Sequence, residues 1–186
     1  MSRLVFLARH ASPDWERRDL PYHLPPGPPL TKAGRQEAAV LGDFLQASGI
    51  RRLYSSPLER CLDTAAIAAR AGGQYVHVLD DLREWQPGET REEVQQRMLR
   101  ALEVTRQAAN DEPPCVLITH GGPIAALLLA LGMDENRLDS YRVYDHRNLL
   151  PPAGAWRVQQ ADGEPGWACE LIFPSGMAEA LPIDQG

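Results

Sequence analysis

The alternation of short strand-like runs with helix-forming segments constrains the fold of this chain more than any other feature. Four runs have the apolar or alternating character of strands: Leu4–Ala8, Arg52–Ser55, Tyr75–Leu79 and Cys115–Thr119. Helical signals occupy residues 31–48, 56–71, the segment from 90 onward, and 123–131. Repeated strand–helix alternation is typical of an α/β fold with a parallel sheet. We therefore expect a three-layer α/β/α sandwich around a mainly parallel sheet.

Capping residues mark the expected helix boundaries. Thr31 is placed to cap the first helix, and Gly49 lies where a C-cap glycine is expected. The segment Ser56-Pro57-Leu58-Glu59 predicts the start of the second helix, with Ser56 as the N-cap and a capping box to the glutamate. A second capping box, Thr90-Arg91-Glu92-Glu93, predicts the start of the third helix.

The C-terminal third of the chain has weaker signals. Trp156–Gln160 and Cys169–Phe173 flank the turn-forming segment Asp162–Gly166 and predict a hairpin that adds antiparallel edge strands. A length of 186 residues fits one domain better than two. We expect a single domain over residues 1–186, with a short cap near residues 80–92.

The composition narrows the classes of partner and the compartment. A net charge of −6 and a pI near 5.4 provide no general footprint for nucleic acid. The apolar run after Met1-Ser2-Arg3 is too short for a signal peptide or a membrane span. Three cysteines without paired spacing do not predict a disulfide framework. We therefore expect a cytoplasmic protein that binds neither nucleic acid nor membranes; its oligomeric state has no sequence signal.

Chemically active side chains follow each of the four predicted strands. They are Arg9-His10, Arg60 in the first turn of the second helix, Arg83-Glu84, and His120-Gly121-Gly122. Because ligands of open α/β sheets bind beyond the carboxyl ends of the strands, we expect these residues to converge on one rim. Two imidazoles, two guanidiniums and a carboxylate would then share one site.

This set of side chains suits phosphoryl transfer. Guanidinium forks match the oxygens of a phosphoryl group, so Arg9 and Arg60 are candidate phosphate ligands, with amides at Gly121 as further donors. A neutral imidazole at His10 can attack phosphorus and form a covalent intermediate that water hydrolyses. His120 can donate to phosphoryl oxygens, and Glu84 can protonate the leaving oxygen and later activate water. Ser12 is a further candidate phosphate donor because it is close to His10 in sequence.

The same segments resemble the signature segments of the histidine phosphatase, or phosphoglycerate-mutase-like, superfamily. The matching segments are Arg9-His10, Leu30–Ala38, Ser55–Arg60 with Thr64-Ala65, and Thr119–Gly122, which lie in the family's order within residues 3–131. The resemblance implies a metal-independent phosphatase without a cofactor. It also implies a phosphohistidine at His10, phosphate binding by Arg9, Arg60 and His120, and an acid near Glu84.

Two departures from the family pattern leave alternatives open. Ala11 replaces the glycine that usually follows the Arg-His pair, and its methyl group could restrict φ or crowd the phosphate. The region after Glu84 is short, which makes Glu89 a rival for the acid; we favour Glu84 because it follows the third strand directly. A weakened phosphate-binding regulatory domain is therefore one alternative function.

A phosphoglycerate-mutase-type phosphotransferase is the other alternative. Only 59 residues separate Arg60 from His120, which leaves little room for the larger cap that retains a substrate through two transfers. We therefore expect a phosphatase that acts on a phosphorylated small molecule or a phosphoprotein. No glycine-rich nucleotide loop or zinc-ligand spacing competes with this interpretation.

Overall fold

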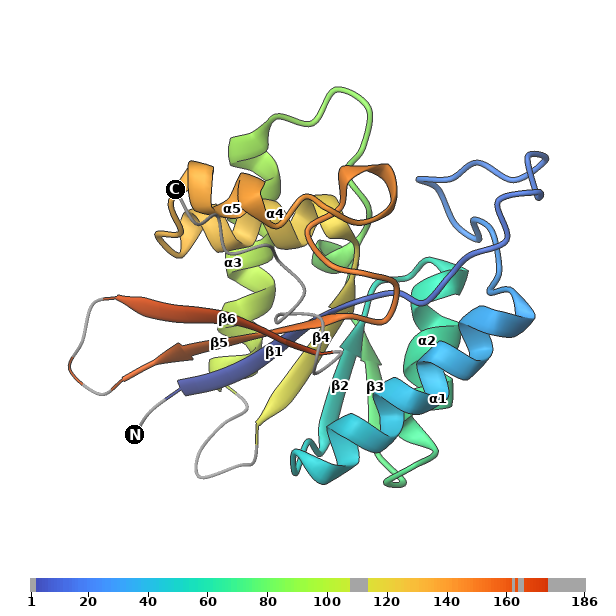
Figure 1. Cartoon of the computed structure of the whole chain (residues 1–186), viewed down its shortest axis with the longest axis horizontal. Coiled ribbons are helices and arrows are strands. Elements are labelled where there is room, and N and C mark those ends of the chain that lie inside the picture. The colour runs from blue at the N-terminus through green and yellow to red at the C-terminus, as the bar shows by residue number, and fades with distance from the viewer. Residues whose placement is uncertain (1–2, 108–113, 162, 164–165, 174–186) are drawn as a thin grey trace, which may run out of the picture.

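The computed structural model describes residues 3–107, 114–161, 163 and 166–173. Its sheet has six strands in the order β3-β2-β4-β1-β5-β6. The strands are β1 (Arg3–Arg9), β2 (Arg52–Ser55), β3 (Tyr75–Val78), β4 (Cys115–Thr119), β5 (Ala155–Gln160) and β6 (Trp167–Phe173). The first four are parallel to one another, and β5 and β6 run antiparallel at one edge (Figure 1). The predicted C-terminal hairpin is confirmed; residues 162, 164 and 165 of its turn lie outside the described part of the chain.

Helices cover both faces of the sheet. On one face lie α1 (Lys32–Ala47) and α2 (Glu59–Ala69); on the other lie α3 (Arg91–Gln107), α4 (Gly121–Ala130) and the short α5 (Glu135–Ser140). Two 3-10 turns, η1 (Asp80–Leu82) and η2 (Asp145–Arg147), connect these elements. The predicted α/β/α sandwich is confirmed, whereas α5 and both 3-10 turns were not expected.

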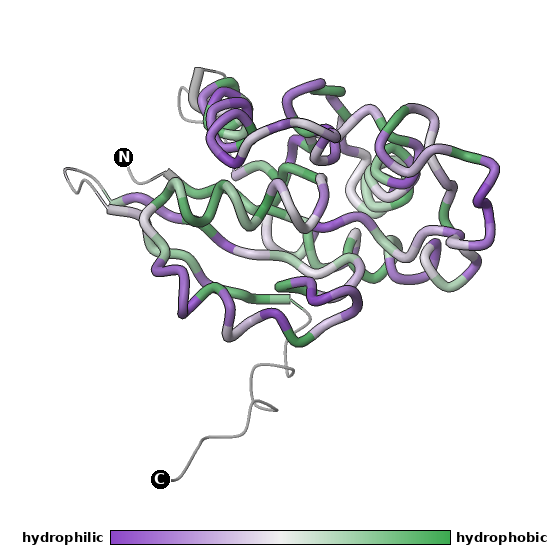
Figure 2. The backbone as a smooth tube through the Cα atoms, turned by 90° about the horizontal axis from the view of Figure 1, so that it is seen from above, coloured by the Kyte–Doolittle hydropathy of each residue, from purple (hydrophilic) through white to green (hydrophobic). Residues whose placement is uncertain are grey.

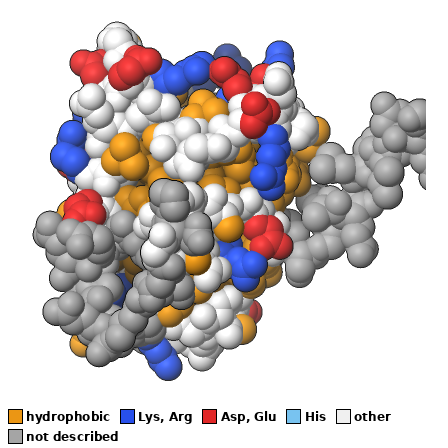
Figure 3. All heavy atoms as spheres, turned by 90° about the vertical axis from the view of Figure 1, so that its left-hand side faces the viewer, with side chains coloured by type: hydrophobic (Ala, Val, Ile, Leu, Met, Phe, Trp, Pro, Cys, Tyr) orange, Lys and Arg blue, Asp and Glu red, His pale blue; other side chains and the backbone are white. Residues whose placement is uncertain are grey.

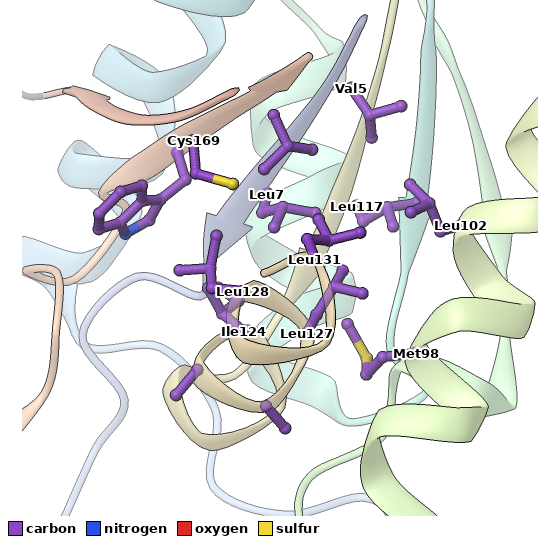
Figure 4. Packing of buried hydrophobic residues seen from close by; sticks show 14 of the residues in the cluster. Val5, Leu7, Met98, Leu102, Leu117, Ile124, Leu127, Leu128, Leu131 and Cys169 are labelled. Atoms are coloured by element: carbon purple, nitrogen blue, oxygen red, sulfur yellow. The ribbon is translucent and has the colours of Figure 1, made fainter. Parts of the chain in front are cut away.

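The sheet separates two apolar cores, because successive residues of a strand point to opposite faces. Val5 and Leu7 of β1 pack with α3 and α4, and Phe6 and Ala8 pack with α1 and α2. Figure 4 shows Leu7 and its neighbours in the first core facing the helices. In Figure 2 hydrophobic stretches run through the middle of the fold, and most hydrophilic stretches lie toward its outside. The central strands are therefore buried on both sides, as their apolar sequences predict.

The outer surface follows the usual distribution of polar and apolar groups. Figure 3 views the face on the left of Figure 1, where apolar side chains gather centrally and charged side chains lie around them. Among the described helices, none combines the length and the apolar character that a membrane crossing requires.

Three of the predicted helix-boundary signals are confirmed. The Thr31 side chain accepts a bond from the Gly34 amide, and Gly49 has a φ of +73° just after α1. Thr90 and Glu93 bond each other reciprocally at the start of α3. The predicted N-cap of the second helix is wrong. α2 begins at Glu59, and its N-cap residue is Leu58, without a side-chain cap.

The hydroxyl of Ser56 has a different partner. Its Oγ lies 2.9 Å from Nε2 of His120, whereas its distance to the Leu58 amide nitrogen is longer, at 3.4 Å. Ser56, which has the best local capping signal, therefore contacts a histidine that is distant in sequence.

Candidate active site

The register of two parallel strands places the two predicted histidines side by side. Arg9 of β1 pairs with Thr119 of β4, so the next residue of each strand, His10 and His120, leaves the sheet at the same level. The His10 amide donates to the Thr119 carbonyl, 2.9 Å away. The two imidazole centroids are 5.2 Å apart. The predicted convergence at the carboxyl ends of the strands is found for this pair.

The imidazole of His10 is held in one tautomer. Its Nδ1 lies 2.8 Å from the carbonyl oxygen of Ala11, and because a carbonyl only accepts, Nδ1 carries the proton and Nε2 keeps its lone pair. Burial lowers the pKa of His10 well below its usual range, and the charges of Arg60 and Arg9 lower it further. The Tyr22 hydroxyl lies 3.5 Å from Nε2. His10 is therefore neutral near pH 7, with a nucleophilic nitrogen facing away from its own backbone.

His120 lies between the ends of β2 and η1. Its Nδ1 is 3.3 Å from Oε2 of Glu84 and 3.1 Å from Nη2 of Arg60, and its Nε2 is 2.9 Å from Oγ of Ser56. Burial lowers the pKa of His120 well below its usual range, and nearby Arg60 and His10 lower it further. This imidazole is therefore also neutral near pH 7 and is fixed on both sides.

The two predicted phosphate-binding arginines are buried and only partly paired. Arg60 donates from Nη1 to the Tyr22 carbonyl at 2.8 Å. Arg9 donates from Nη1 and Nη2 to Asp145 at 2.6 and 2.7 Å, and from Nη1 to the Leu150 carbonyl at 3.1 Å. Within the described residues, the buried Nε of each arginine has no hydrogen-bond partner. Because an unpaired buried donor costs about 1–3 kcal/mol, the two Nε–H groups indicate a place for an anion.

The two rival acids have different surroundings. Glu84 places Oε2 3.3 Å from both His120 and Arg60, next to the proposed chemistry. Glu89 is bonded to Arg97 at 2.7 Å and to the Gln86 amide at 2.9 Å. Partial burial alone would raise the pKa of Glu89, but the bonds from Arg97 and Gln86 outweigh it and the pKa lies below its usual value. The geometry favours Glu84 as the acid and gives Glu89 a place in an ion pair.

The surroundings of Ser12 and Ala11 differ from those that the sequence suggested. The amide and hydroxyl of Ser12 both donate to the Glu37 carboxylate, each at 2.8 Å, so these donors are already bonded. Ala11 is fully buried in the core beneath α1, does not have a positive φ, and donates its amide to Thr64 Oγ1 at 3.0 Å. Its methyl group therefore adds to the core, and the backbone here does not require glycine.

Comparison with known proteins agrees with the geometry of the site. A model of the histidine phosphatase superfamily (branch 1) matches residues 5–90 and 85–149. The chain belongs to the histidine phosphatase superfamily. A glucosyl-3-phosphoglycerate phosphatase of Mycolicibacterium vanbaalenii is 30% identical, over 74% of this chain and 77% of the relative.

Solved structures show the same fold as this histidine phosphatase. YhfR of Bacillus stearothermophilus has a TM-score of 0.72 at 21% identity and covers 91% of this chain and 96% of its own. A mycobacterial glucosyl-3-phosphoglycerate phosphatase in complex with inorganic phosphate has a TM-score of 0.67 at 25% identity, with 91% and 96% covered.

The histidine phosphatase site also contains a set of possible metal ligands. His10, Glu84 and His120 each offer one ligand atom, and these atoms lie within 4.8 Å of one another. The Arg60 guanidinium is 3.1 Å from His120 and 3.3 Å from Glu84, so a cation at this position would be repelled by its positive charge. The local charge therefore favours an anion.

Several residues of this histidine phosphatase site were missed from the sequence. Tyr22 covers the Arg60 guanidinium, 4.0 Å from Cζ to the ring centroid, and Trp15 stacks on Tyr22 with centroids 4.8 Å apart. Asp145 binds Arg9, as described above. Arg97 had a usable signal, because it lies at helical spacing among the apolar residues of α3. Asp145 had none, since it contacts a partner 136 residues away.

Proposed function

We propose that this protein hydrolyses a phosphomonoester through a phosphohistidine intermediate on Nε2 of His10. The observation that carries the proposal is the pairing of a neutral, single-tautomer His10 with two buried guanidinium N–H groups that have no hydrogen-bond partner in the described part of the chain. A phosphoryl group supplies both things that these residues lack, which are acceptor oxygens for the arginines and an electrophile for the imidazole.

Phosphate binding in this proposal uses donors from three parts of the chain. Arg9 and Arg60 donate from their free Nε–H groups, and His120 donates from Nε2 when a phosphate oxygen takes the place of the Ser56 hydroxyl there. The first amides of α4, starting at Gly121, have no intrahelical acceptor and add donors at the positive end of the helix. Ser12 stays a candidate only if an incoming phosphate displaces it from Glu37.

The first chemical step transfers the phosphoryl group to the enzyme. The lone pair of His10 Nε2 forms a bond to phosphorus as the bond from phosphorus to the leaving oxygen breaks. Glu84, in its protonated form, gives its proton to that oxygen, so the leaving group departs as a neutral alcohol. The Nδ1 bond to the Ala11 carbonyl stabilises the positive charge that the ring acquires.

The second step returns the enzyme to its starting state. The Glu84 carboxylate removes a proton from water, and the water oxygen attacks phosphorus as the nitrogen–phosphorus bond breaks. Inorganic phosphate leaves, His10 regains its lone pair, and Glu84 is again protonated. Arg60, which is 3.3 Å from Glu84, balances the carboxylate charge between the two steps.

A phosphorylated small molecule is the proposed substrate class. The relative that is 30% identical is named for glucosyl-3-phosphoglycerate, an ester of this kind, and this supports the choice over a phosphoprotein. We further propose that residues 1–186 form one domain with a short cap near residues 80–92, working in the cytoplasm without metal or cofactor. The buried thiols of Cys61 and Cys169, which are not in disulfides, support a reducing compartment.

Hydrolysis of 4-nitrophenyl phosphate in excess EDTA tests the proposal, using wild type, His10→Ala and the exposed-histidine control His77→Ala. We expect chelator-resistant turnover in wild type and the control, and a loss of at least a thousandfold in His10→Ala. Chelator-sensitive turnover, or activity that survives in His10→Ala, would overturn the mechanism. Transfer of phosphate between hydroxyl groups without net release would favour the mutase alternative.

A further inference from the structure

The loop that carries Glu84 is built around one buried guanidinium. Arg97 of α3 is 1% exposed, and it hydrogen-bonds to residues of η1 and of the loop that leads into α3 (Figure 1). Its acceptors are the carbonyls of Asp81 (Nη1, 2.8 Å), Arg83 (Nη1, 2.8 Å) and Glu84 (Nη2, 3.4 Å), and the Glu89 carboxylate (Nε, 2.7 Å; Nη2, 3.1 Å). An arginine has five N–H donors, and here each of them has an acceptor in residues 81–89.

The contacts of Arg97 bracket the proposed acid on both sides. They fix the backbone before Glu84 at Asp81 and Arg83, the residue itself through its carbonyl, and the end of the loop at Glu89. Within the loop, the Trp85 amide donates to Glu84 Oε1 at 2.9 Å, which leaves Oε2 facing His120. The orientation of the Glu84 carboxylate therefore depends on a loop conformation that Arg97 holds together with Gln86, whose Nε2 donates to the Glu84 carbonyl at 2.8 Å.

Other side chains of the loop reinforce this arrangement without replacing it. Trp85 donates from Nε1 to the Glu89 carbonyl at 2.8 Å, and the Gln86 amide donates to the Glu89 carboxylate. These bonds close the segment from Trp85 to Glu89 but do not reach back to Asp81 or Arg83. Loss of Arg97 would leave two partly buried carbonyls before Glu84 without this donor. Among the described residues, Glu89 would then keep Arg83 as its cationic partner, at 3.3 Å.

We infer that Arg97 is a positioning residue for acid–base catalysis by Glu84, an inference that rests on the proposed function. Arg97 hydrogen-bonds to neither of the two histidines, although its charge contributes to the lowered pKa of His120. Its hydrogen bonds therefore act on the reaction through the position of the Glu84 carboxylate. Proton donation matters more when the leaving oxygen is a poor leaving group. The effect of changing Arg97 should therefore grow with the basicity of the leaving group.

The test compares two esters, 4-nitrophenyl phosphate and phenyl phosphate, whose leaving groups differ in how much they need a proton. Arg97→Met removes all five donors, and Arg97→Lys keeps the charge while concentrating three donors at one point. The control is Arg100→Met, on the same helix, which removes an exposed pair with the Asp81 side chain. We expect both Arg97 variants, like Glu84→Gln measured beside them, to lose at least tenfold more kcat/KM on phenyl phosphate than on 4-nitrophenyl phosphate. The control should match wild type.

A second measurement separates positioning from a general loss of structure. With 4-nitrophenyl phosphate, Arg97→Lys should accumulate phosphohistidine, detected by intact mass at neutral pH, because water activation also needs Glu84. Equal losses on the two esters without accumulation would overturn the role assigned to Arg97, even if Arg97→Met fails to fold. If wild type lacks His10-dependent hydrolysis of either ester, the proposed function itself fails, so the two failures are distinguishable.

Discussion

The carboxylate of Asp145 binds the guanidinium of Arg9 end-on, with 2.6 Å between Oδ1 and Nη1 and 2.7 Å between Oδ2 and Nη2. Together with the Leu150 carbonyl, this pair uses three of the four Nη hydrogens. The remaining donors are Nε–H and one hydrogen of Nη2, which form the side fork of the guanidinium. Asp145 therefore leaves free the edge of Arg9 that suits a phosphate.

Removing the Asp145 carboxylate should destabilise the protein and increase its response to phosphate. Asp145→Ala leaves the buried Arg9 charge without its partner, and we expect about 1–3 kcal/mol of lost stability, since the aspartate side chain is 36% exposed. Inorganic phosphate compensates that charge when it binds, so it should raise Tm more in the variant than in wild type.

The surface pair of Asp139 and Arg142 offers the control for this prediction, measured by thermal unfolding with and without phosphate. Asp139→Ala breaks an ion pair whose carboxylate is 59% exposed and should change stability by less than about 0.5 kcal/mol. An identical phosphate-induced rise in Tm for wild type and Asp145→Ala would contradict the assignment of Arg9 to phosphate.

Ser56→Ala should lower catalysis more than stability. The hydroxyl lies 2.9 Å from Nε2 of His120, and without it the imidazole keeps only the contacts of its other nitrogen and a long contact, 3.5 Å, to the Cys61 thiol. We expect kcat/KM to fall about tenfold while the free energy of unfolding falls by about 1 kcal/mol.

The neighbouring Ser55 gives a matched control, because its buried hydroxyl donates to the Ser56 carbonyl and does not contact His120. Steady-state kinetics of Ser55→Ala and Ser56→Ala on the same ester make the comparison. Equal losses in the two variants would mean that the Ser56 hydroxyl has no specific effect on His120.

Stability should fall as the pH is lowered through the histidine range. Burial holds the pKa values of His10 and His120 well below 6.5, so the folded state stays unprotonated there while the unfolded state takes up protons. The free energy of unfolding is therefore unaffected by these two groups above pH 6.5. Below that pH it falls by up to about 1.4 kcal/mol per pH unit for each histidine.

Chemical denaturation between pH 7.5 and 5 checks this sign. His120→Gln should show a shallower decline than wild type, whereas the exposed His77→Gln should follow the wild-type curve. A stability that rises on acidification would show that the two histidines are protonated in the folded protein.

Gly121→Ala should disturb the site through Asn148. A Cβ at position 121 would lie 2.2 Å from Oδ1 and 2.3 Å from Nδ2 of Asn148, too close for either atom to stay. The backbone amide of Asn148 donates to the Asp145 carbonyl at 2.9 Å, so a displacement of Asn148 strains the turn that holds Arg9. Because the Asn148 side chain is only partly buried and can turn away, we expect a loss of about 1 kcal/mol and reduced phosphate affinity.

Gly122→Ala is the control, because its added Cβ would meet its closest neighbour, Trp85, at 3.4 Å, an ordinary contact. Shortening the opposing side chain in Gly121→Ala/Asn148→Ala should restore part of the stability lost by the single glycine variant. A double variant that is less stable than Gly121→Ala would show that crowding is not the cause. Calorimetry of the four proteins decides between these outcomes.

The sequence predicted the parts of the site that follow from strand order. His10 and His120 could be placed together because parallel strands end on one rim of the sheet. The apolar runs of β1 and β4 were enough to predict that both strands are buried in that sheet. The capping signal at Ser56 failed because a hydroxyl forms its best bond with whichever partner the tertiary fold supplies, and His120 is closer than the helix amides.

The remaining site residues depend on contacts that local patterns do not encode. Asp145 lies in a turn where His146 and Arg147 adopt positive φ values of 51° and 56°. Neither residue is glycine, so the sequence does not indicate this backbone conformation. Such strain persists only when surrounding contacts hold it, and those contacts, including the bond to Arg9, join distant segments.

The Tyr22 hydroxyl lies next to Nε2 of His10, the nitrogen that attacks phosphorus in the proposed mechanism. Reacting atoms need to come within about 3–3.5 Å, and the hydroxyl already lies at 3.5 Å. An ester bound at Nε2 would therefore compete with this hydroxyl, and a shift of the Tyr22 ring would change its stacking on Trp15. We therefore expect the fluorescence emission of Trp15 to change when Tyr22 moves away from His10.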